Sequence, residues 1–410
     1  MKGPWRHPSF RWLYLGRNID ALGNGVAPVA LAFAVLDLTG SKVALGIVVA
    51  ARSVTNVALL LFGGVVADRF RRERVAVVAA SMAALSQSAV AGLVLTGSAQ
   101  VWSLAAISAV NGAAAALALP ASSAMLPQIV DAGDLPKANA LLRVGLNLAG
   151  LLGVAAGVQL VAAVGPGWGI AVDAASFAVS ALAFSRVQPS PAMPQERATV
   201  LADLLDGWSE FTRRRWVWIV VAQFAVVNAA SSGVRGVLAP VVADQTFGRQ
   251  AYGWILTIFS LGLLAGSLLA LKIRPRRTLL YGVSVILLLA LPPLALAVSP
   301  TVVPVALAFF ITALAYDQFG VAWDLSLQQN VSSDKLARVY SYDMVGSLAA
   351  VPIGQVLVGP LAQAFGTERT LLVCASAIVL ATLLAISDPS VRGLVTHSQE
   401  AISGEPDVAS

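Results

Sequence analysis

Long apolar runs separated by short polar segments occupy most of the chain. Twelve of them can be marked, with approximate limits at residues 12–37, 43–67, 75–96, 101–125, 138–164, 168–187, 216–243, 250–271, 278–298, 302–325, 335–364 and 369–387. A helix rises about 1.5 Å per residue, so about 20 apolar residues cross a hydrocarbon layer about 30 Å thick. The pattern therefore predicts an all-α integral membrane protein with twelve transmembrane helices.

The composition supports this class. Hydrophobic residues make up 58% of the 410 residues and charged residues only 12%, whereas a soluble domain carries about 25% charge. The formal net charge of +6 comes from basic residues scattered over short loops rather than from one stripe. We therefore expect contact with membrane lipid and no nucleic-acid partner.

The sequence shows no enzyme chemistry. No glycine-rich phosphate loop ending in Lys and then Ser or Thr occurs, so ATP-driven transport is unsupported. The two histidines, His7 and His397, lie in the terminal segments and offer no metal cluster, and the single cysteine, Cys374, lies inside an apolar run. We expect no catalytic residue, no metal and no cofactor.

Basic residues are divided unequally between the two ends of the apolar runs. With the N-terminus in the cytoplasm, the cytoplasmic connections and termini hold twenty Lys and Arg residues, and the opposite side holds only Lys42, Arg249 and Arg369. Short loops rich in Lys and Arg resist translocation. The asymmetry predicts that both termini lie in the cytoplasm.

The two halves of the chain repeat each other. The pattern Asp-x-Thr-x-x-(Lys or Arg)-x-Ala-x-Gly occurs at residues 37–46 and again at 244–253, and a second similarity relates 128–145 to 329–346. We expect an N-terminal six-helix bundle (1–187), a cytoplasmic linker (188–215), a C-terminal six-helix bundle (216–388) and a disordered tail (389–410). Apolar residues at helical spacing predict an amphipathic surface helix in the second part of the linker.

The connection between the second and third runs carries a motif that resembles the major facilitator superfamily. The pattern of that superfamily, Gly-x-x-x-Asp-Arg-x-Gly-Arg-Arg, is matched by Gly64, Asp68, Arg69 and Arg72, with Arg71 in place of the glycine. Segments 36–41, 119–124, 137–141 and 172–177 are similar to bacterial exporters related to the enterobactin and macrolide efflux proteins. The resemblance implies two six-helix repeats enclosing a cavity, in the bacterial cytoplasmic membrane.

The same motif carries a gating hypothesis. We expect Asp68 to lie at the cytoplasmic surface beside the start of the eleventh run, where Ser332, Ser333 and Asp334 can cap a helix, since the free amides of a helix start attract an anion. In the superfamily such contacts clamp the two halves on the inner side. The alternative is that the arginines serve only as a positive-inside anchor.

Asp20 is the leading candidate for a proton carrier. Arg17, Asp20 and Asn24 share one helical face, and an ionisable group within a span is a functional hypothesis by default. Exporters of the subgroup tend to have the acid at the position of Asn24, so either the acid has moved by one turn or the coupling differs. A structural Arg17–Asp20 ion pair is the alternative.

Further polar residues within the spans are candidates for lining the substrate cavity. Arg52 and Arg235 need either a partner from across the cavity or an anionic substrate, and we expect Asp317, a second candidate for proton coupling, to neutralise Arg235. Asp173 lies on a span that is outermost in the superfamily, and we expect it to bond within its own helix. The complete set of cavity candidates is Arg17, Asn24, Arg52, Asn111, Arg143, Asn147, Asn228, Arg235, Gln318 and Trp323.

The fifth run contains part of a glycine pattern associated with antiporters. Gly153 and Gly157 are present, but the proline of the pattern is missing, which places an antiport mechanism in question. The small residues still predict close packing of this helix against its neighbours.

These features predict a monomeric secondary exporter of amphiphilic small molecules, such as antibiotics or siderophores, that works by alternating access and is driven by protons. A nutrient importer of the same fold is one alternative. A membrane sensor or scaffold without transport activity is another, and it would tolerate the loss of Asp20 and Arg52 with no change in any flux.

Overall fold

The computed structural model describes residues 3–188, 208–209, 211–270, 272–273, 275–331 and 333–394. All the regular structure within these residues is helical. Twelve helical segments are long and apolar enough to cross a membrane, which confirms the predicted number. They are Pro8–Thr39, Lys42–Leu60, Arg72–Leu95, Val101–Ser123, Lys137–Val164, Pro166–Ser185, Arg215–Gln245, Arg249–Ala270, Thr278–Val298, Val302–Asn330, Tyr342–Phe365 and Thr367–Ser387.

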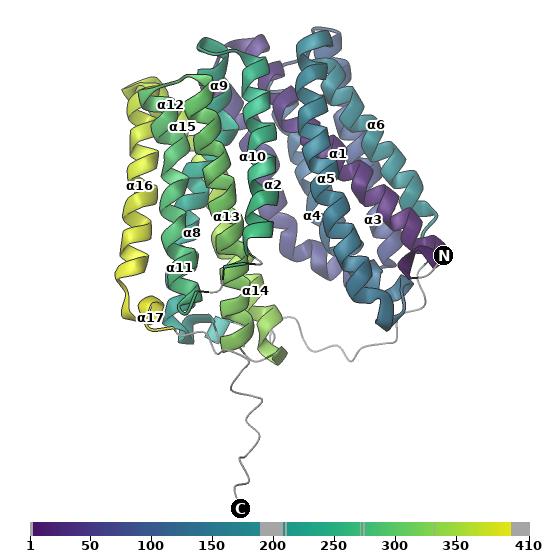
Figure 1. Cartoon of the computed structure of the whole chain (residues 1–410). Helices are drawn as coiled ribbons and strands as arrows, with labels where there is room; N and C mark the ends of the chain where they lie inside the picture. Colours follow the sequence, from purple (N-terminus) through teal and green to yellow (C-terminus); the bar gives the residue numbers. More distant parts are fainter. Residues whose placement is uncertain are drawn as a thin grey trace, which may run out of the picture.

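The helices form two groups that stand side by side (Figure 1). The N-terminal group contains η1 (Pro4–Arg6), α1 (Pro8–Thr39), α2 (Lys42–Arg69), α3 (Arg72–Leu95), α4 (Val101–Ile129), η2 (Ala132–Asp134), α5 (Leu135–Val164) and α6 (Pro166–Ser185). The C-terminal group contains α8 (Arg215–Gly233), η3 (Val234–Leu238), α9 (Ala239–Gln245), α10 (Arg249–Ala270), α11 (Thr278–Val285), η4 (Ile286–Ala290), α12 (Leu291–Val298), α13 (Val302–Asn330), α14 (Ser333–Leu348), α15 (Val351–Phe365), α16 (Thr367–Ser387) and α17 (Pro389–Arg392).

Three of the runs predicted as continuous are interrupted in the C-terminal group. A π-helical turn, η3, separates α8 from α9, and the 3-10 turn η4 separates α11 from α12. A turn at Ala349 and Ala350 separates α14 from α15. In each case a proline, namely Pro240, Pro292 or Pro352, stands within the first two residues of the helix that follows. Proline lacks the amide donor that would continue the preceding helix.

The two groups pack against each other mainly along two pairs of helices. α2 packs against α15, and α5 packs against α10. The boundaries assigned to the domains remain a prediction. The first part of the expected linker, and most of its expected amphipathic helix, fall in residues 189–207, outside the described residues, as does the tail from residue 395.

Close packing of α5, predicted from its glycines, is confirmed against α1. A Cβ atom added at Gly153 would lie 2.0 Å from the carbonyl oxygen of Leu22, and one added at Gly157 would lie 2.8 Å from the Cα atom of Val26. These distances are shorter than van der Waals contact, so the two backbones approach in a way that only glycine permits. This approach fixes the position of α1, which carries the candidate proton site.

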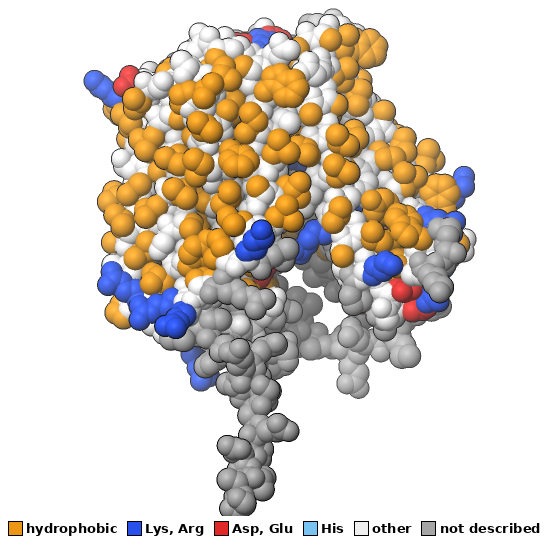
Figure 2. Space-filling model, in the orientation of Figure 1, with side chains coloured by type: hydrophobic (Ala, Val, Ile, Leu, Met, Phe, Trp, Pro, Cys, Tyr) orange, Lys and Arg blue, Asp and Glu red, His pale blue; other side chains and the backbone are white. Residues whose placement is uncertain are grey.

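The outer faces of both groups are apolar. Large side chains such as Leu85 and Leu384 are more than 70% exposed, and Figure 2 shows apolar side chains over the full height of the visible face, with Lys and Arg gathered at its lower edge. Such a surface is stable only in contact with lipid tails. The described protein is therefore a multi-pass membrane protein.

Candidate functional site

A cavity of about 150 Å³ lies within the N-terminal group of helices. Its polar lining comes from Arg17, Asp20, Asn24, Arg52, Asn111 and Ser122, and most of the remainder from small alanines of α3 and α4. Four of the predicted cavity residues and the predicted proton carrier thus meet around one space. The sequence placed the substrate site between the two halves, whereas helices of the N-terminal group alone bound this cavity.

Asn24 links the acid of α1 to the cation of α2. Its side-chain amide nitrogen donates to the Oδ1 atom of Asp20 at 3.3 Å and to the Asp20 carbonyl oxygen at 3.0 Å. Its amide oxygen accepts a long hydrogen bond from Arg52 at 3.4 Å. The (i, i+4) spacing of Asp20 and Asn24 places both on one face of α1, and Arg52 reaches that face from α2.

Arg52 is held mainly by neutral groups. Its Nε atom donates to the Oδ1 atom of Asn111 at 2.8 Å, and the amide of Asn111 donates to the Ser86 hydroxyl at 3.3 Å. Arg52 also lies within electrostatic reach of Asp20 and Asp173. A cation with two acids near it but bonded to neither can change its partner without first breaking a tight ion pair.

The alternative of a close Arg17–Asp20 ion pair is not formed in the structure. Among the described residues of α1, the charged atoms of these two side chains lie more than 4.0 Å apart. Their attraction acts over a longer range. Asp20 is therefore bonded to the neutral amide of Asn24 and is free of a tight ion pair.

Asp173 is a member of this network that the sequence analysis missed. It is fully buried, and its Oδ2 atom accepts a hydrogen bond from Gln87 of α3 at 2.6 Å. The expectation that its side chain bonds within its own helix is wrong, because the partner lies on another helix. Sequence gives the periodicity of each helix but not which helices pack together. The sequence signal that could have indicated this contact is the presence of two polar residues within apolar spans, Asp173 in one and Gln87 in another.

The backbone of α1 comes close to the Asp173 carboxylate. A Cβ atom added at Gly23 would lie 2.6 Å from the Oδ1 atom of Asp173 and 1.9 Å from the Ser176 hydroxyl oxygen. The Oδ1 atom is buried and has no hydrogen-bond partner. Glycine at position 23 thus permits an acid of α6 to lie against the helix that carries Asp20.

The suggested neutralisation of Arg235 by Asp317 is wrong. Arg235 is exposed, and its guanidinium lies 5.2 Å from the ring centre of Phe259. Asp317 instead lies within electrostatic reach of Arg143, which α5 contributes from the other group. Membership of the same half was the only basis for the pairing, and it carries no information on where the two side chains lie along their helices.

The remaining candidates are distributed over the two groups. Asn147 is exposed on α5, as is Arg143. Asn228 donates to the Ser347 carbonyl oxygen at 2.9 Å, and the Gln318 amide donates to the Gly266 carbonyl oxygen at 2.6 Å. Each of these bonds joins helices within the C-terminal group.

Trp323 is also packed within the C-terminal group. It is 5% exposed, stacks near Phe319 and donates to the Oδ2 atom of Asp343 at 2.8 Å. A contact with substrate at these C-terminal positions remains a prediction.

The gating motif lies at the end of α2 and the start of α3. The side chains of Gly64, Asp68 and Arg69 are outside the description, although their backbone continues α2. Arg72 begins α3 and is half-buried. The gating role of this motif therefore remains a prediction.

Polar contacts between the two groups occur where α1 joins α2. Arg249, the first residue of α10, pairs with Asp37 of α1 at 2.5 Å and with Asp244 of its own group at 2.5 Å. The Arg249 guanidinium also lies 4.8 Å from the ring centre of Phe33 in α1. One arginine of the C-terminal group thus binds both charge and aromatic surface of the N-terminal group.

A second basic residue makes the reciprocal connection. The Lys42 ammonium of α2 donates to the Ala362 carbonyl oxygen at 2.9 Å and to the Thr367 hydroxyl at 3.0 Å. Lys42 and Arg249 occupy the same position of the repeated pattern, and each binds the opposite group. We call Asp37, Lys42, Asp244 and Arg249, with the acceptors on Ala362 and Thr367, the latch.

The latch closes one end of the protein. It lies at the end where α1 meets α2 and where α9 meets α10, which is the upper end in Figure 1. Figure 2 shows the surface hollowed between the two groups at the opposite, lower edge. The described residues of the two groups are therefore joined at one end and, on the face that Figure 2 shows, hollowed at the other.

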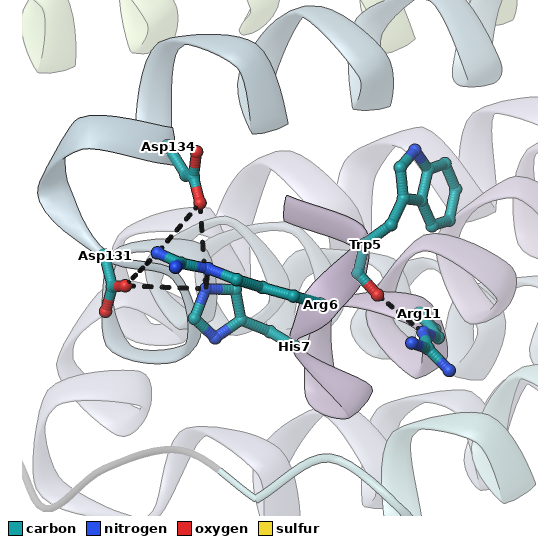
Figure 3. Close-up of polar contacts among 6 residues, drawn as sticks. All are labelled: Trp5, Arg6, His7, Arg11, Asp131 and Asp134. Atoms are coloured by element: carbon teal, nitrogen blue, oxygen red, sulfur yellow. Dashed lines mark hydrogen bonds and ion pairs between the residues drawn. The ribbon is translucent and has the colours of Figure 1, made fainter. Parts of the chain in front are cut away.

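An ionic cluster at the start of the chain joins η1 to the connection between α4 and α5 (Figure 3). Arg6 pairs with Asp131 and, at 3.2 Å, with Asp134. The Nε2 atom of His7 lies 3.8 and 3.9 Å from the same two carboxylates and accepts a hydrogen bond from Arg6. The position of His7 in a terminal segment predicted no cluster there, and its partners, Asp131 and Asp134, lie far along the chain. Since the Arg6 guanidinium already binds the carboxylates, a metal ion would have to displace it.

Taken together, the fold and the cavity define a class of protein. Twelve membrane-crossing helices in two groups, joined at one end and enclosing ionisable side chains, are typical of a multi-pass transporter rather than of an enzyme. The sequence model of the transmembrane secretion effector family matches residues 2–404. The chain belongs to this family of the major facilitator superfamily and is a transporter.

Characterised relatives and solved structures agree with this assignment. The multidrug efflux pump Tap of Mycobacterium tuberculosis is 28% identical over 96% of each chain. The enterobactin exporter EntS of Escherichia coli is 28% identical over 66% of this chain and 65% of its own length. The solved nucleoside transporter NupG has a TM-score of 0.73, with 15% identity over 92% of this chain and 98% of its own. A bacterial homologue of the human lysosomal transporter Spinster has the same TM-score, with 16% identity, and covers 94% of this chain and 96% of its own.

Proposed function

We propose that this chain is a proton-coupled exporter of amphiphilic small molecules that works by alternating access. The efflux direction is supported by the family and by the two relatives named as exporters. The chemical class of the substrate rests on the same relatives, one a multidrug pump and the other a siderophore exporter. The exporter works as a monomer in contact with lipid and without a nucleic-acid partner.

The proposed location is the cytoplasmic membrane of a bacterium, with both termini in the cytoplasm. The gathering of Lys and Arg at the lower edge in Figure 2 supports this orientation. Only three basic residues fall on the opposite side, and two of them, Lys42 and Arg249, form the latch. With this orientation the latch faces outward, and the hollow between the groups opens to the cytoplasm.

The observation that carries proton coupling is the link from Asp20 through Asn24 to Arg52. An ionised carboxylate in a membrane interior is costly unless a cation or water compensates its charge. Protonation of Asp20 removes its attraction to Arg17 and Arg52, so α1 and α2 are held differently in the two protonation states. A proton can therefore favour one conformation over the other.

The same two helices carry the residues that the N-terminal group contributes to the latch. Asp37 stands near the end of α1 and Lys42 at the start of α2, so both helices run from the cavity to the outer contacts. A shift of α1 against α2 at Asp20 is transmitted along rigid helices to the latch. This arrangement joins proton binding to the opening of the outer side.

The proposal is tested by accumulation of an amphiphilic dye, ethidium, and a panel of antibiotics in a host that lacks its own exporters. Cells with the wild-type protein should accumulate less of at least one compound, and a protonophore should abolish the difference. Asp20→Asn should behave like the protonophore, whereas Asp324→Asn, which removes an exposed acid of α13, should behave like the wild type. Accumulation above that of empty cells, or full activity of Asp20→Asn, would contradict the proposal.

A further inference from the structure

Asp173 has a setting that a purely structural acid does not need. It is fully buried, only one of its oxygens has a hydrogen-bond partner, and that partner is the neutral amide of Gln87. Among the described residues, no basic atom lies within 4.0 Å of it. A permanently ionised carboxylate at this position would be costly, because a single neutral donor binds it and one of its oxygens is left unpaired.

The charged groups around Asp173 are few. α1 contributes Arg17 and Asp20 to the network, α2 contributes Arg52, and α6 contributes Asp173 itself. In the neighbouring cavity, whose lining does not include Asp173, the lining residues from α3, α4 and α5 carry no charge. Gln87, Ser86 and Asn111 are the neutral polar groups that bind the two partners. Any change in the charge of Asp173 therefore acts on both Arg52 and Asp20.

Arg52 interacts electrostatically with both acids. It lies within electrostatic reach of both Asp173 and Asp20, and its hydrogen bonds go to the amides of Asn111 and Asn24. When Asp20 gains a proton, Arg52 keeps only Asp173 as an ionised neighbour. When Asp20 loses its proton, both acids can carry a negative charge, and two like charges within electrostatic reach of each other are unfavourable.

We propose that Asp173 is a second proton-binding residue of the transport cycle, coupled to both Asp20 and Arg52. An ionised Asp20 favours a protonated Asp173, and an ionised Asp173 favours a protonated Asp20. The proton moves between solvent and carboxylate, with no other bond formed or broken. This inference rests on the proposed function, because it extends the proton site of the same exporter.

The test follows the carbonyl stretch of protonated carboxylic acids by infrared difference spectroscopy of the purified full-length protein as the pH is stepped. No substrate is needed. The wild-type spectrum should contain a titrating carboxylic acid that is lost in Asp173→Asn and another that is lost in Asp20→Asn. Each substitution should also shift the titration midpoint of the remaining acid by about one pH unit, because coupling between two sites is reciprocal.

The matched control is Asp324→Asn, which removes an acid bonded to Tyr340 on another helix and should leave both midpoints unchanged. A carboxylic acid signal at Asp173 that never titrates, or two midpoints that are independent of each other, would overturn the inference. If Asp173→Asn does not fold, Gln87→Leu retains the acid and removes its hydrogen-bond donor. An unchanged midpoint in that variant would equally overturn it.

Failure of this inference is distinguishable from failure of the proposed function. Proton-driven export that survives Asp20→Asn contradicts the proposed function whatever the infrared spectra show. If proton-driven export is lost in Asp20→Asn but the Asp173 signal does not titrate, only the second proton site is rejected.

Discussion

At the residue scale, the decisive side chain is Asn24, because it connects Asp20 and Arg52, which form no ion pair with each other. It gives a hydrogen bond to Asp20 and accepts one from Arg52. The sequence predicted all three residues as candidates, since each is a polar group in an apolar span. It could not predict their connection, because Arg52 comes from a second helix whose rotation no periodicity specifies.

Replacing Asn24 should weaken coupling without removing either charged group. Asn24→Leu deletes two hydrogen bonds that involve charged partners, each worth about 1.5 to 3 kcal/mol. We expect the rate of proton-driven transport to fall by about tenfold or more, since about 1.4 kcal/mol corresponds to a factor of ten. Initial rates of ethidium or antibiotic export measure this effect.

Asn139→Ala is the control for this substitution. Asn139 is an exposed residue of α5 whose side chain donates to the Leu135 carbonyl oxygen, so its loss should leave the rate unchanged. A wild-type rate in Asn24→Leu would mean that the link between Asp20 and Arg52 has no part in transport.

At the element scale, helix packing depends on glycines. The sequence predicted that these glycines allow close packing but not which helix they contact. Gly153 and Gly157 were recognised as small residues, and the structure shows that they let α5 approach α1. The neighbouring Gly150 has open space where its Cβ atom would lie. Sequence does not distinguish these glycines, because the face of α5 that meets α1 is set by tertiary packing.

This difference gives a matched pair of stability variants. Gly153→Ala introduces a methyl group that would lie 2.0 Å from the Leu22 carbonyl oxygen, and overpacking of this kind costs about 1 to 3 kcal/mol. Gly150→Ala should be neutral or slightly stabilising, because alanine favours a helix by up to about 1 kcal/mol over glycine. Thermal unfolding in detergent should show a lower Tm only for Gly153→Ala, and equal Tm values would refute the packing argument.

The latch is the second feature at this scale. The repeated pattern at 37–46 and 244–253 was visible in the sequence as a sign of internal duplication. Its role was not visible, because Lys42 and Arg249 bind groups from the opposite half. A repeat within one chain does not show which surfaces meet across the interface.

Loss of the latch should favour the state that opens on this side. Arg249→Gln removes the ion pairs with Asp37 and Asp244, so spin labels at the outer ends of α2 and α15 should show a larger population at long distance. Arg369→Gln changes an exposed basic residue on the same side and serves as the control. Identical distance distributions in wild type and Arg249→Gln would exclude the latch as a gate.

At the scale of the whole molecule, the hydropathy of the sequence predicted the number of spans. For most helix ends, the predicted limit lies within a few residues of the observed one. The breaks at η3, at η4 and before α15 were not predicted, because a continuous apolar run gives no sign of a local change of helix type. The position of the cavity within the N-terminal group was also beyond the sequence, since the resemblance implied a space between the halves. Asp173 belongs to this cavity network only because α6 packs on α1 and α3.

The central claim is that protonation of a buried acid network drives export through a two-group transporter. It is tested most directly in proteoliposomes, by measuring ethidium or antibiotic movement together with proton movement under an imposed pH gradient. The account predicts that a pH gradient alone drives the compound against its own gradient, that protons move in the opposite direction, and that both fluxes vanish in Asp20→Asn. Movement of the compound that follows only its own gradient and carries no proton flux would contradict it.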